Sequence, residues 1–322
     1  MIRKIFGIFI LSLSILLFFA YFSLNFRNPL KKSFDFEIKK GDNPKGILKI
    51  LKEKGIIFDW QFPYIYLKFT KLDKKIKAGE YQIQPGERVM DILKKFLEGR
   101  TIYIPVTLKE GWTIFDYAKE LERKGICSKD SFLNSCKRVP LWIEAKNMEG
   151  FLYPDTYFFR KNTPSDEVVI KLYNNFLKKT KDLRQVLQEK KLKPLEWITL
   201  ASIVEREAKM ESEKPKIAGV YLNRLKINMK LEADPTILYG MALAGIERKI
   251  LTKEDLKFPS DYNTYLNYGL PPGPICNPSY SSMKAVLYPE EHNFLFFVAK
   301  GDGSHIFSEN LKDHIKAIQL YR

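Results

Sequence analysis

The most constraining feature of this 322-residue chain is an uninterrupted apolar segment near its start. Residues 5–26 contain no charged side chain and follow two basic residues. At about 1.5 Å per helical residue the segment reaches about 33 Å, enough to cross a hydrocarbon core of about 30 Å. A cleaved signal peptide has a shorter apolar core and a small-residue cleavage site, whereas here the bulky Phe22 precedes Ser23. We therefore predict an uncleaved transmembrane helix after a short cytoplasmic end at residues 1–4.

Basic residues flank this helix on both sides, so their count does not set its orientation. A span this close to the start most simply leaves the rest of the chain outside the cytoplasm. We expect a single-pass protein of the cell (inner) membrane, with its body on the periplasmic or extracytoplasmic side.

Charge and composition limit the classes of partner that the protein could bind, but they do not select one class. Apolar residues make up 45% and charged residues 29%, as in ordinary folded proteins. The net charge of +16 favours anionic lipid, cell-wall polymer or nucleic acid. A solvated lysine-rich surface explains the charge equally well.

After a connector at residues 27–33, a strand–turn–helix pattern appears and then recurs. Apolar and charged residues alternate from 34 to 39, as in a half-buried strand, and Asn43 and Pro44 are suited to start a helix. A similar pattern begins at Val106, and in both copies the second glycine follows the first at an interval of 14 positions. We predict α+β modules of the kind that bind extended polymers, although strand–Gly–helix is also a common local arrangement.

The helix predicted from Leu195 to Met210 carries the first residue suited to chemistry. Its apolar residues form one stripe, and Glu205 and Glu207 lie on opposite borders of that stripe. A carboxylate at the edge of an apolar surface is partly desolvated, which raises its pKa toward the range of a general acid. The alternative is a border glutamate that merely reaches solvent.

Two further segments carry polar residues in an informative arrangement. Glu232 and Asp234 have the i, i+2 spacing that puts both side chains on one face of an extended segment. They could orient a sugar or position an acid, or Asp234 could simply cap a helix that begins at Pro235. Residues 269–278, with four prolines and two glycines, predict a stiff loop that either binds ligand or only connects elements.

The C-terminal region predicts a hairpin, with strands at 294–299 and 305–307, followed by a helix from about Asn310. Nucleotide-binding, dinucleotide-binding and zinc-protease motifs do not occur, so we expect no cofactor and no metal. Cys127 and Cys136 could form a disulfide outside the cytoplasm.

Six segments together resemble the endolytic murein transglycosylase family, also called the MltG or YceG-like proteins. They are residues 149–157, 201–207, 221–225, 233–236, 262–265 and 269–275. The resemblance covers nearly the whole chain. It implies an α+β fold with an N-terminal transmembrane helix, a LysM-like module at 34–100, and a catalytic domain at 101–322 that begins with the second strand–helix module.

The resemblance also implies an activity, which is cleavage of the bond between N-acetylmuramic acid and N-acetylglucosamine in peptidoglycan glycan strands, leaving 1,6-anhydro ends. Glu205 would be the single acid and base of this lyase. The residues expected to orient it or to bind sugar are Asp155, Asn223, Glu232, Asp234, Asn263, Tyr265 and Asn277. Some relatives carry Gln where this chain has Glu232.

Glycan strands, membrane lipid and cell-wall synthesis proteins are the implied partners, and nucleic acid is not. Two other functions stay open. One is a muramidase-type hydrolase that uses Glu205 with Glu232 or Asp234 and water. The other is a non-catalytic scaffold that binds peptidoglycan through the modules.

Overall fold

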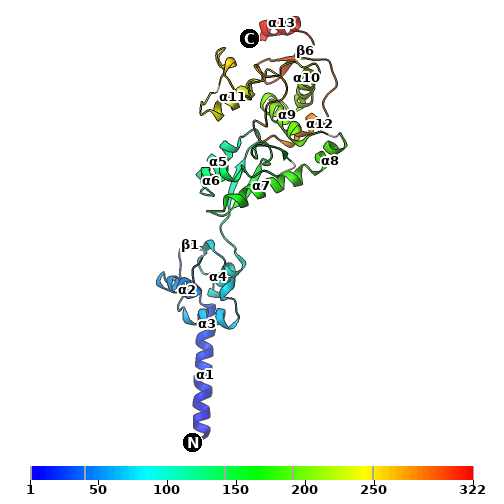
Figure 1. Cartoon of the computed structure of the whole chain (residues 1–322). Helices are drawn as coiled ribbons and strands as arrows, with labels where there is room; N and C mark the ends of the chain where they lie inside the picture. Colours follow the sequence, from blue (N-terminus) through cyan, green and yellow to red (C-terminus); the bar gives the residue numbers. More distant parts are fainter. Residues whose placement is uncertain (1, 40, 141–142, 191, 249, 322) are drawn as a thin grey trace. The chain divides into compact units, whose positions relative to one another are not determined.

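The computed structural model describes residues 2–39, 41–140, 143–190, 192–248 and 250–321, so Met1 lies outside the described residues. The chain forms two compact units, Met1–Ile104 and Pro105–Arg322. Both combine helices with two-stranded sheets (Figure 1), and the α+β expectation is confirmed at this level.

The first unit begins with the helix α1 (Ile2–Asn25), and the stretch Lys4–Asn25 is long and apolar enough to cross a membrane. Its end contacts the helices α3 and α4 of the same unit. The predicted connector is not a free linker, because Asn28 is buried and its amide donates to the carbonyls of Gln84 and Glu87 at 2.8 and 3.0 Å. The chain therefore passes from α1 into the first unit without a flexible break.

The remainder of the first unit alternates strands and helices in the order β1, α2, α3, β2, α4. Their bounds are β1 Phe34–Ile38, α2 Pro44–Glu53, α3 Gln61–Phe69, β2 Gly79–Ile83 and α4 Val89–Glu98. The strands pair antiparallel, with Phe36 opposite Tyr81. The predicted start of α2 is confirmed, since the Asn43 side chain accepts from the Gly46 amide at 2.7 Å.

The second unit begins with the second predicted module and continues into a helical body. The module comprises β3 (Ile104–Leu108), α5 (Ile114–Arg123), α6 (Lys129–Ser135) and β4 (Asp155–Phe159). Strand β3 pairs with β4. Thr113 and Asp116 form a capping box at the start of α5, as the local sequence favours. Cys127 and Cys136 are free thiols.

The helical body is built around α9 (Pro194–Glu207). The helices near it in sequence are α7 (Ser165–Lys179), α8 (Lys181–Glu189), α10 (Lys214–Lys226), α11 (Asp234–Leu243) and α12 (Tyr280–Leu287). The single apolar stripe predicted for α9 is wrong, because every residue from Trp197 to Val204 is buried. Helices α10, α11 and α12 all contact α9, so it is covered on several faces.

The remaining elements close the second unit. Residues 269–278 form an irregular and mostly buried connection, and the Ile275 amide donates to the Ser202 hydroxyl at 3.0 Å. The predicted hairpin and last helix are confirmed as β5 (Phe296–Ala299), β6 (His305–Ser308) and α13 (Leu311–Tyr321). Short 3-10 turns lie at Asp73–Lys75, Glu211–Glu213 and Asp255–Lys257.

Candidate active site

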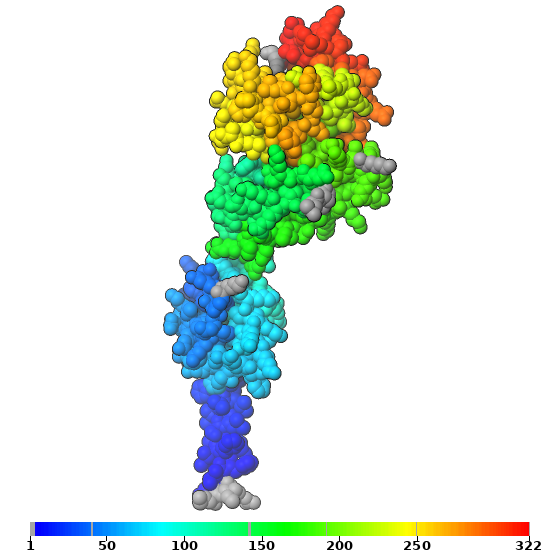
Figure 2. All heavy atoms as spheres, in the orientation of Figure 1, coloured from blue at the N-terminus to red at the C-terminus, as the bar shows by residue number. Residues whose placement is uncertain are grey.

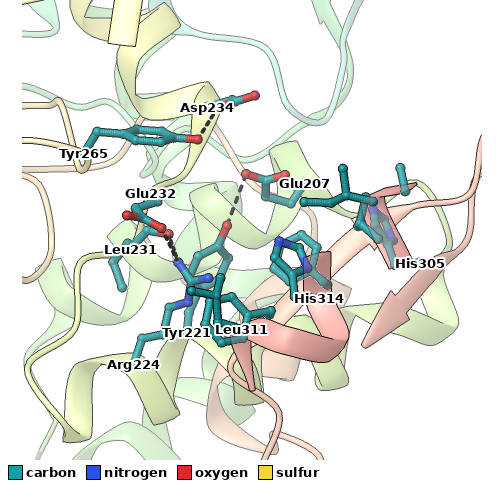
Figure 3. A pocket seen from close by; sticks show the side chains of 15 residues that line it. Glu207, Tyr221, Arg224, Leu231, Glu232, Asp234, Tyr265, His305, Leu311 and His314 are labelled. Atoms are coloured by element: carbon teal, nitrogen blue, oxygen red, sulfur yellow. Dashed lines mark hydrogen bonds and ion pairs between the residues drawn. The ribbon is translucent and has the colours of Figure 1, made fainter. Parts of the chain in front are cut away.

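A cavity of about 340 Å³ lies in the second unit, between the ends of α9 and α10, the start of α11 and the β5–β6 hairpin (Figure 3). Most of its lining is polar or aromatic. The principal lining residues are Glu207, Tyr221, Arg224, Glu232, Asp234, Tyr265, Phe296, Phe297, His305 and His314. The cavity therefore brings together carboxylates, hydroxyls and aromatic rings, the groups that bind and cleave sugars.

Glu207 is the last residue of α9 and faces this cavity (Figure 3). Its Oε1 accepts a hydrogen bond from the Tyr221 hydroxyl at 3.1 Å. Burial raises the pKa of Glu207 to about 7, the Asp234 carboxylate adds to the rise, and the Tyr221 hydrogen bond opposes it. At neutral pH this side chain can thus hold a proton or release it, as a general acid and base requires.

Glu232 and Asp234 line the same cavity, as expected, but not through an extended segment, because Glu232 has a φ of 48° and Asp234 is the first residue of α11. Asp234 Oδ1 accepts from the Tyr265 hydroxyl at 2.8 Å. Glu232 lies 3.5 Å from the Arg224 guanidinium. The predicted cap is shifted by one residue, because α11 begins at Asp234 itself and Ala233 occupies the capping position.

Arg224 ties the hairpin to the cavity. Its Nε donates to the Leu295 carbonyl at 2.6 Å and its Nη1 to the Leu231 carbonyl at 2.8 Å. The guanidinium also lies over the Phe296 ring, 5.2 Å from the ring centre. The position of β5 beside α10 therefore depends on this side chain.

Glu205 lies outside this cavity, in a polar cage at the start of α12. Its Oε2 accepts from the Ser279 amide at 3.0 Å and from the Ser279 and Ser282 hydroxyls, each at 2.5 Å. The buried Lys214 ammonium lies 3.4 Å away. The side chain is only 9% exposed. Ser279 itself caps α12 through its side chain, and together with Ser282 it holds the Glu205 carboxylate in polar surroundings that differ from the apolar border predicted for it.

Two of the predicted asparagines, Asn223 and Asn263, hold backbone near the site and do not line the cavity. The Asn223 amide donates to the carbonyls of His292 and Phe294 at 2.7 and 3.2 Å. Asn263 is buried and accepts from the Tyr265 amide at 2.9 Å, which positions a cavity residue. They are positioning residues for the loops around the cavity.

Asn277 joins the Pro-rich connection to the strand–helix module at the start of the second unit. Its Oδ1 accepts from the amides of Gly150 and Leu152 at 3.0 and 3.1 Å, and its Nδ2 donates to Glu149 at 3.1 Å. All of its side-chain bonds are thus made within the fold. The sugar-binding role expected for the Pro-rich connection gains no support from this arrangement.

Asp155 belongs to a different surface. It lies on β4 in a shallow groove with residues of α7, where it accepts from the Asn175 amide at 3.1 Å. It does not line the cavity that contains Glu207.

Several cavity residues were missed by reasoning from the sequence. Tyr221 and Arg224 lie next to the predicted Asn223 in one motif of α10. Only the helical period could have indicated that they face the cavity and Asn223 does not. His305 was assigned only to a strand, yet its Nδ1 lies 2.6 Å from Glu213. Phe296 and Phe297 gave no sequence signal beyond the hairpin pattern.

A family model for the YceG-like family matches residues 36–320. The chain belongs to the YceG-like family. An endolytic murein transglycosylase of Bacillus subtilis (strain 168) is 32% identical over 314 residues, which cover 90% of this chain and 85% of that relative. Another, of Streptococcus pneumoniae serotype 2 (strain D39 / NCTC 7466), is 26% identical over 88% of this chain and 57% of its own length.

A crystal structure of a YceG-like protein from Listeria monocytogenes is similar in fold, with a TM-score of 0.61 and 31% sequence identity. The similarity covers 89% of this chain and 99% of that one. The cavity, its carboxylates and the hairpin all lie within the residues that the YceG-like family model matches.

Proposed function

We propose that this chain is a membrane-anchored lytic transglycosylase that cleaves peptidoglycan glycan strands internally. The names of its curated relatives support the reaction class. The observation that carries the proposal within this chain is Glu207, a cavity carboxyl whose pKa is raised to about 7 beside Asp234 and Tyr221.

In this proposal Glu207, and not Glu205, is the catalytic acid. It protonates the glycosidic oxygen between N-acetylmuramic acid and N-acetylglucosamine, and the bond breaks through an oxocarbenium-like state. The carboxylate then takes the proton of the C6 hydroxyl, whose oxygen closes on C1 to give the 1,6-anhydro end. No water is consumed, so one carboxylate serves both steps.

The other cavity groups have supporting roles. Tyr221 orients Glu207 through Oε1, and Oε2 accepts no hydrogen bond from the described residues, which leaves it to carry the proton. Asp234 and Glu232 are suited to accept hydrogen bonds from sugar hydroxyls. Phe296 of the hairpin packs against the Arg224 guanidinium and the His314 ring, so it forms part of the cavity wall.

The same proposal assigns roles to the first unit. The helix α1 would anchor the protein in the cell membrane, with the body on the extracytoplasmic side. Residues 34–100 would form a LysM-like glycan-binding module, supported by two helices between two antiparallel strands. Residues 101–322 would form the catalytic domain, and cell-wall synthesis proteins would be partners.

A matched pair of variants tests the assignment. Glu207→Gln should lower the cleavage rate of purified glycan strands by about 10²- to 10⁴-fold, the usual contribution of a general acid. Glu205→Gln should keep cleavage within about tenfold but lower the stability by about 1–3 kcal/mol, because it weakens a buried hydrogen-bond cage. Thermal unfolding and product masses read out both effects.

The opposite pattern, with activity lost only in Glu205→Gln, would restore Glu205 as the acid. Product masses separate the reactions, because hydrolysis adds one water and leaves reducing ends. Reducing ends would assign the two-carboxylate mechanism, in which Glu207 works with Glu232 or Asp234. Glycan binding without any cleavage by the parent protein would favour the scaffold function.

A further inference from the structure

The helix α3 of the first unit has an apolar face that the core does not use. Phe62, Ile65 and Phe69 fall at i, i+3 and i+7 and thus share one side of the helix. Ile65 is 57% exposed, and Phe69, at 89%, is more exposed than any other large apolar residue described. The buried residues Pro63 and Leu67 lie on the opposite side.

This face begins beside the end of α1. Ser23 in α1 donates a hydrogen bond to Asp59, just before α3. Phe19 in α1 and Phe62 in α3 line the same small cavity. Phe19 precedes Asn25, the last residue of α1, by six positions, or about 9 Å along the helix axis. The start of the apolar face of α3 is therefore level with the final turns of the predicted membrane span.

The surroundings of α3 are those of a membrane interface. Phe58, which is 52% exposed, extends the apolar face toward α1, and its ring centre lies 5.7 Å from that of Phe22. The exposed Lys71, Lys74 and Lys75 follow the helix within six residues. An apolar surface flanked by lysines fits the boundary between acyl chains and anionic headgroups.

We propose that the α3 face, defined as Phe58, Phe62, Ile65 and Phe69, lies in the headgroup region of the bilayer that α1 spans. Continuity with α1 argues for lipid as the occupant, since Figure 2 shows the dark blue helix entering the blue part of the first unit directly. The first unit then has two contacts with the membrane and is held at a fixed height above it. This inference rests on the proposal that α1 is a membrane anchor.

The test measures depth in the bilayer with the full chain in vesicles of phosphatidylethanolamine and phosphatidylglycerol. An environment-sensitive dye is attached to Phe69→Cys in a Cys127→Ser background, in which the two remaining native cysteines are buried. Leu11→Cys, near the middle of α1, is the control for insertion. Glu37→Cys is the aqueous control, because its strand β1 lies at the end of the first unit away from α1 (Figure 1).

A nitroxide on the lipid headgroup should reduce the emission of the dye at 69, and a nitroxide deep in the acyl chain should reduce that at 11. The dye at 37 should respond to neither. Quenching at 11 without quenching at 69 would overturn the interfacial contact and leave the anchor intact. Absence of quenching at 11 would overturn both. If the emission of the dye at 69 changes with the number of protein molecules per vesicle and with neither nitroxide, the α3 face would instead contact a second copy of the chain.

Discussion

Glu205 and Glu207 stand two positions apart at the end of α9 and meet different surroundings. A step of two residues turns the side chain by about 200° around a helix. One carboxylate therefore reaches the start of α12, and the other reaches the cavity. The sequence placed both at borders of an apolar stripe, but it carried no information on what lies beyond each border.

The pH dependence of cleavage should report the protonation of Glu207. The rate should fall as pH rises through about 7, because the acid must be protonated to act. Asp234→Asn removes a charge that raises this pKa and should shift the alkaline limb to lower pH. Tyr221→Phe removes a hydrogen bond that lowers it and should shift the limb to higher pH. Profiles of kcat/KM that move together in both variants would contradict the assignment.

A second buried carboxyl, Glu149, should make stability depend on pH. Burial raises its pKa to about 8 from an ordinary 4.5, while hydrogen bonds from the Ile114 amide and the Tyr239 hydroxyl oppose the rise. The folded protein therefore keeps a proton that the unfolded chain releases. This contribution to stability is fully present below about pH 4.5 and is lost as pH rises through about 8.

Glu149→Gln, which cannot ionise, tests this linkage. Between pH 5 and pH 8 the melting temperature of the parent should fall by more than that of the variant. The corresponding loss in the free energy of unfolding should be larger in the parent by the order of a few kcal/mol. Equal shifts in the two proteins would show that Glu149 titrates normally in the fold.

At the scale of single elements, local sequence predicted helix starts to within about one residue, whereas the helix expected to end at Met210 ends at Glu207. Asn43 caps α2 as expected, and Thr113 caps α5 in a similar way, because capping depends on residues within four positions. The break between α7 and α8 at Thr180 was not predicted, because the residues on both sides have helical spacing.

A pair of helical glycines should respond to alanine with opposite signs. A Cβ at Gly219 in α10 would come within 2.6 Å of the Glu290 carbonyl oxygen, so Gly219→Ala should destabilise by about 1–3 kcal/mol. A Cβ at Gly46 in α2 would meet nothing closer than 3.4 Å, and Gly46→Ala should stabilise by up to about 1 kcal/mol. The midpoints of denaturant unfolding measure both changes in stability. Equal changes in the two variants would refute the close approach of α10 to the segment before β5.

At the scale of the whole molecule, the apolar start of the chain and its net charge predict different modes of membrane attachment, which salt can distinguish. If α1 spans the bilayer, the protein should remain with membranes after a wash at about 1 M salt, at which charges more than about 3 Å apart are screened. A protein held only by its lysines should be released.

Leu13→Lys combined with Leu16→Lys is the control for this prediction. Two lysines at the centre of the helix cost about 5–7 kcal/mol of insertion free energy, so this variant should appear in the wash. Retention of the variant would mean that α1 does not hold the protein in the bilayer.

The succession of elements could be predicted without coordinates, because it depends on residues that are close in the sequence. These local features are the alternating and helical periods, the helix caps and the 22-residue apolar start. Glu232 and Asp234 were expected on one surface and both line the cavity, although the segment is not extended at Glu232, whose φ is 48°. The different surroundings of Glu205 and Glu207 could not be predicted in this way. They depend on Ser279 and on the β5–β6 hairpin, which lie more than 70 residues further along the chain and meet α9 and α10 only when the helices pack.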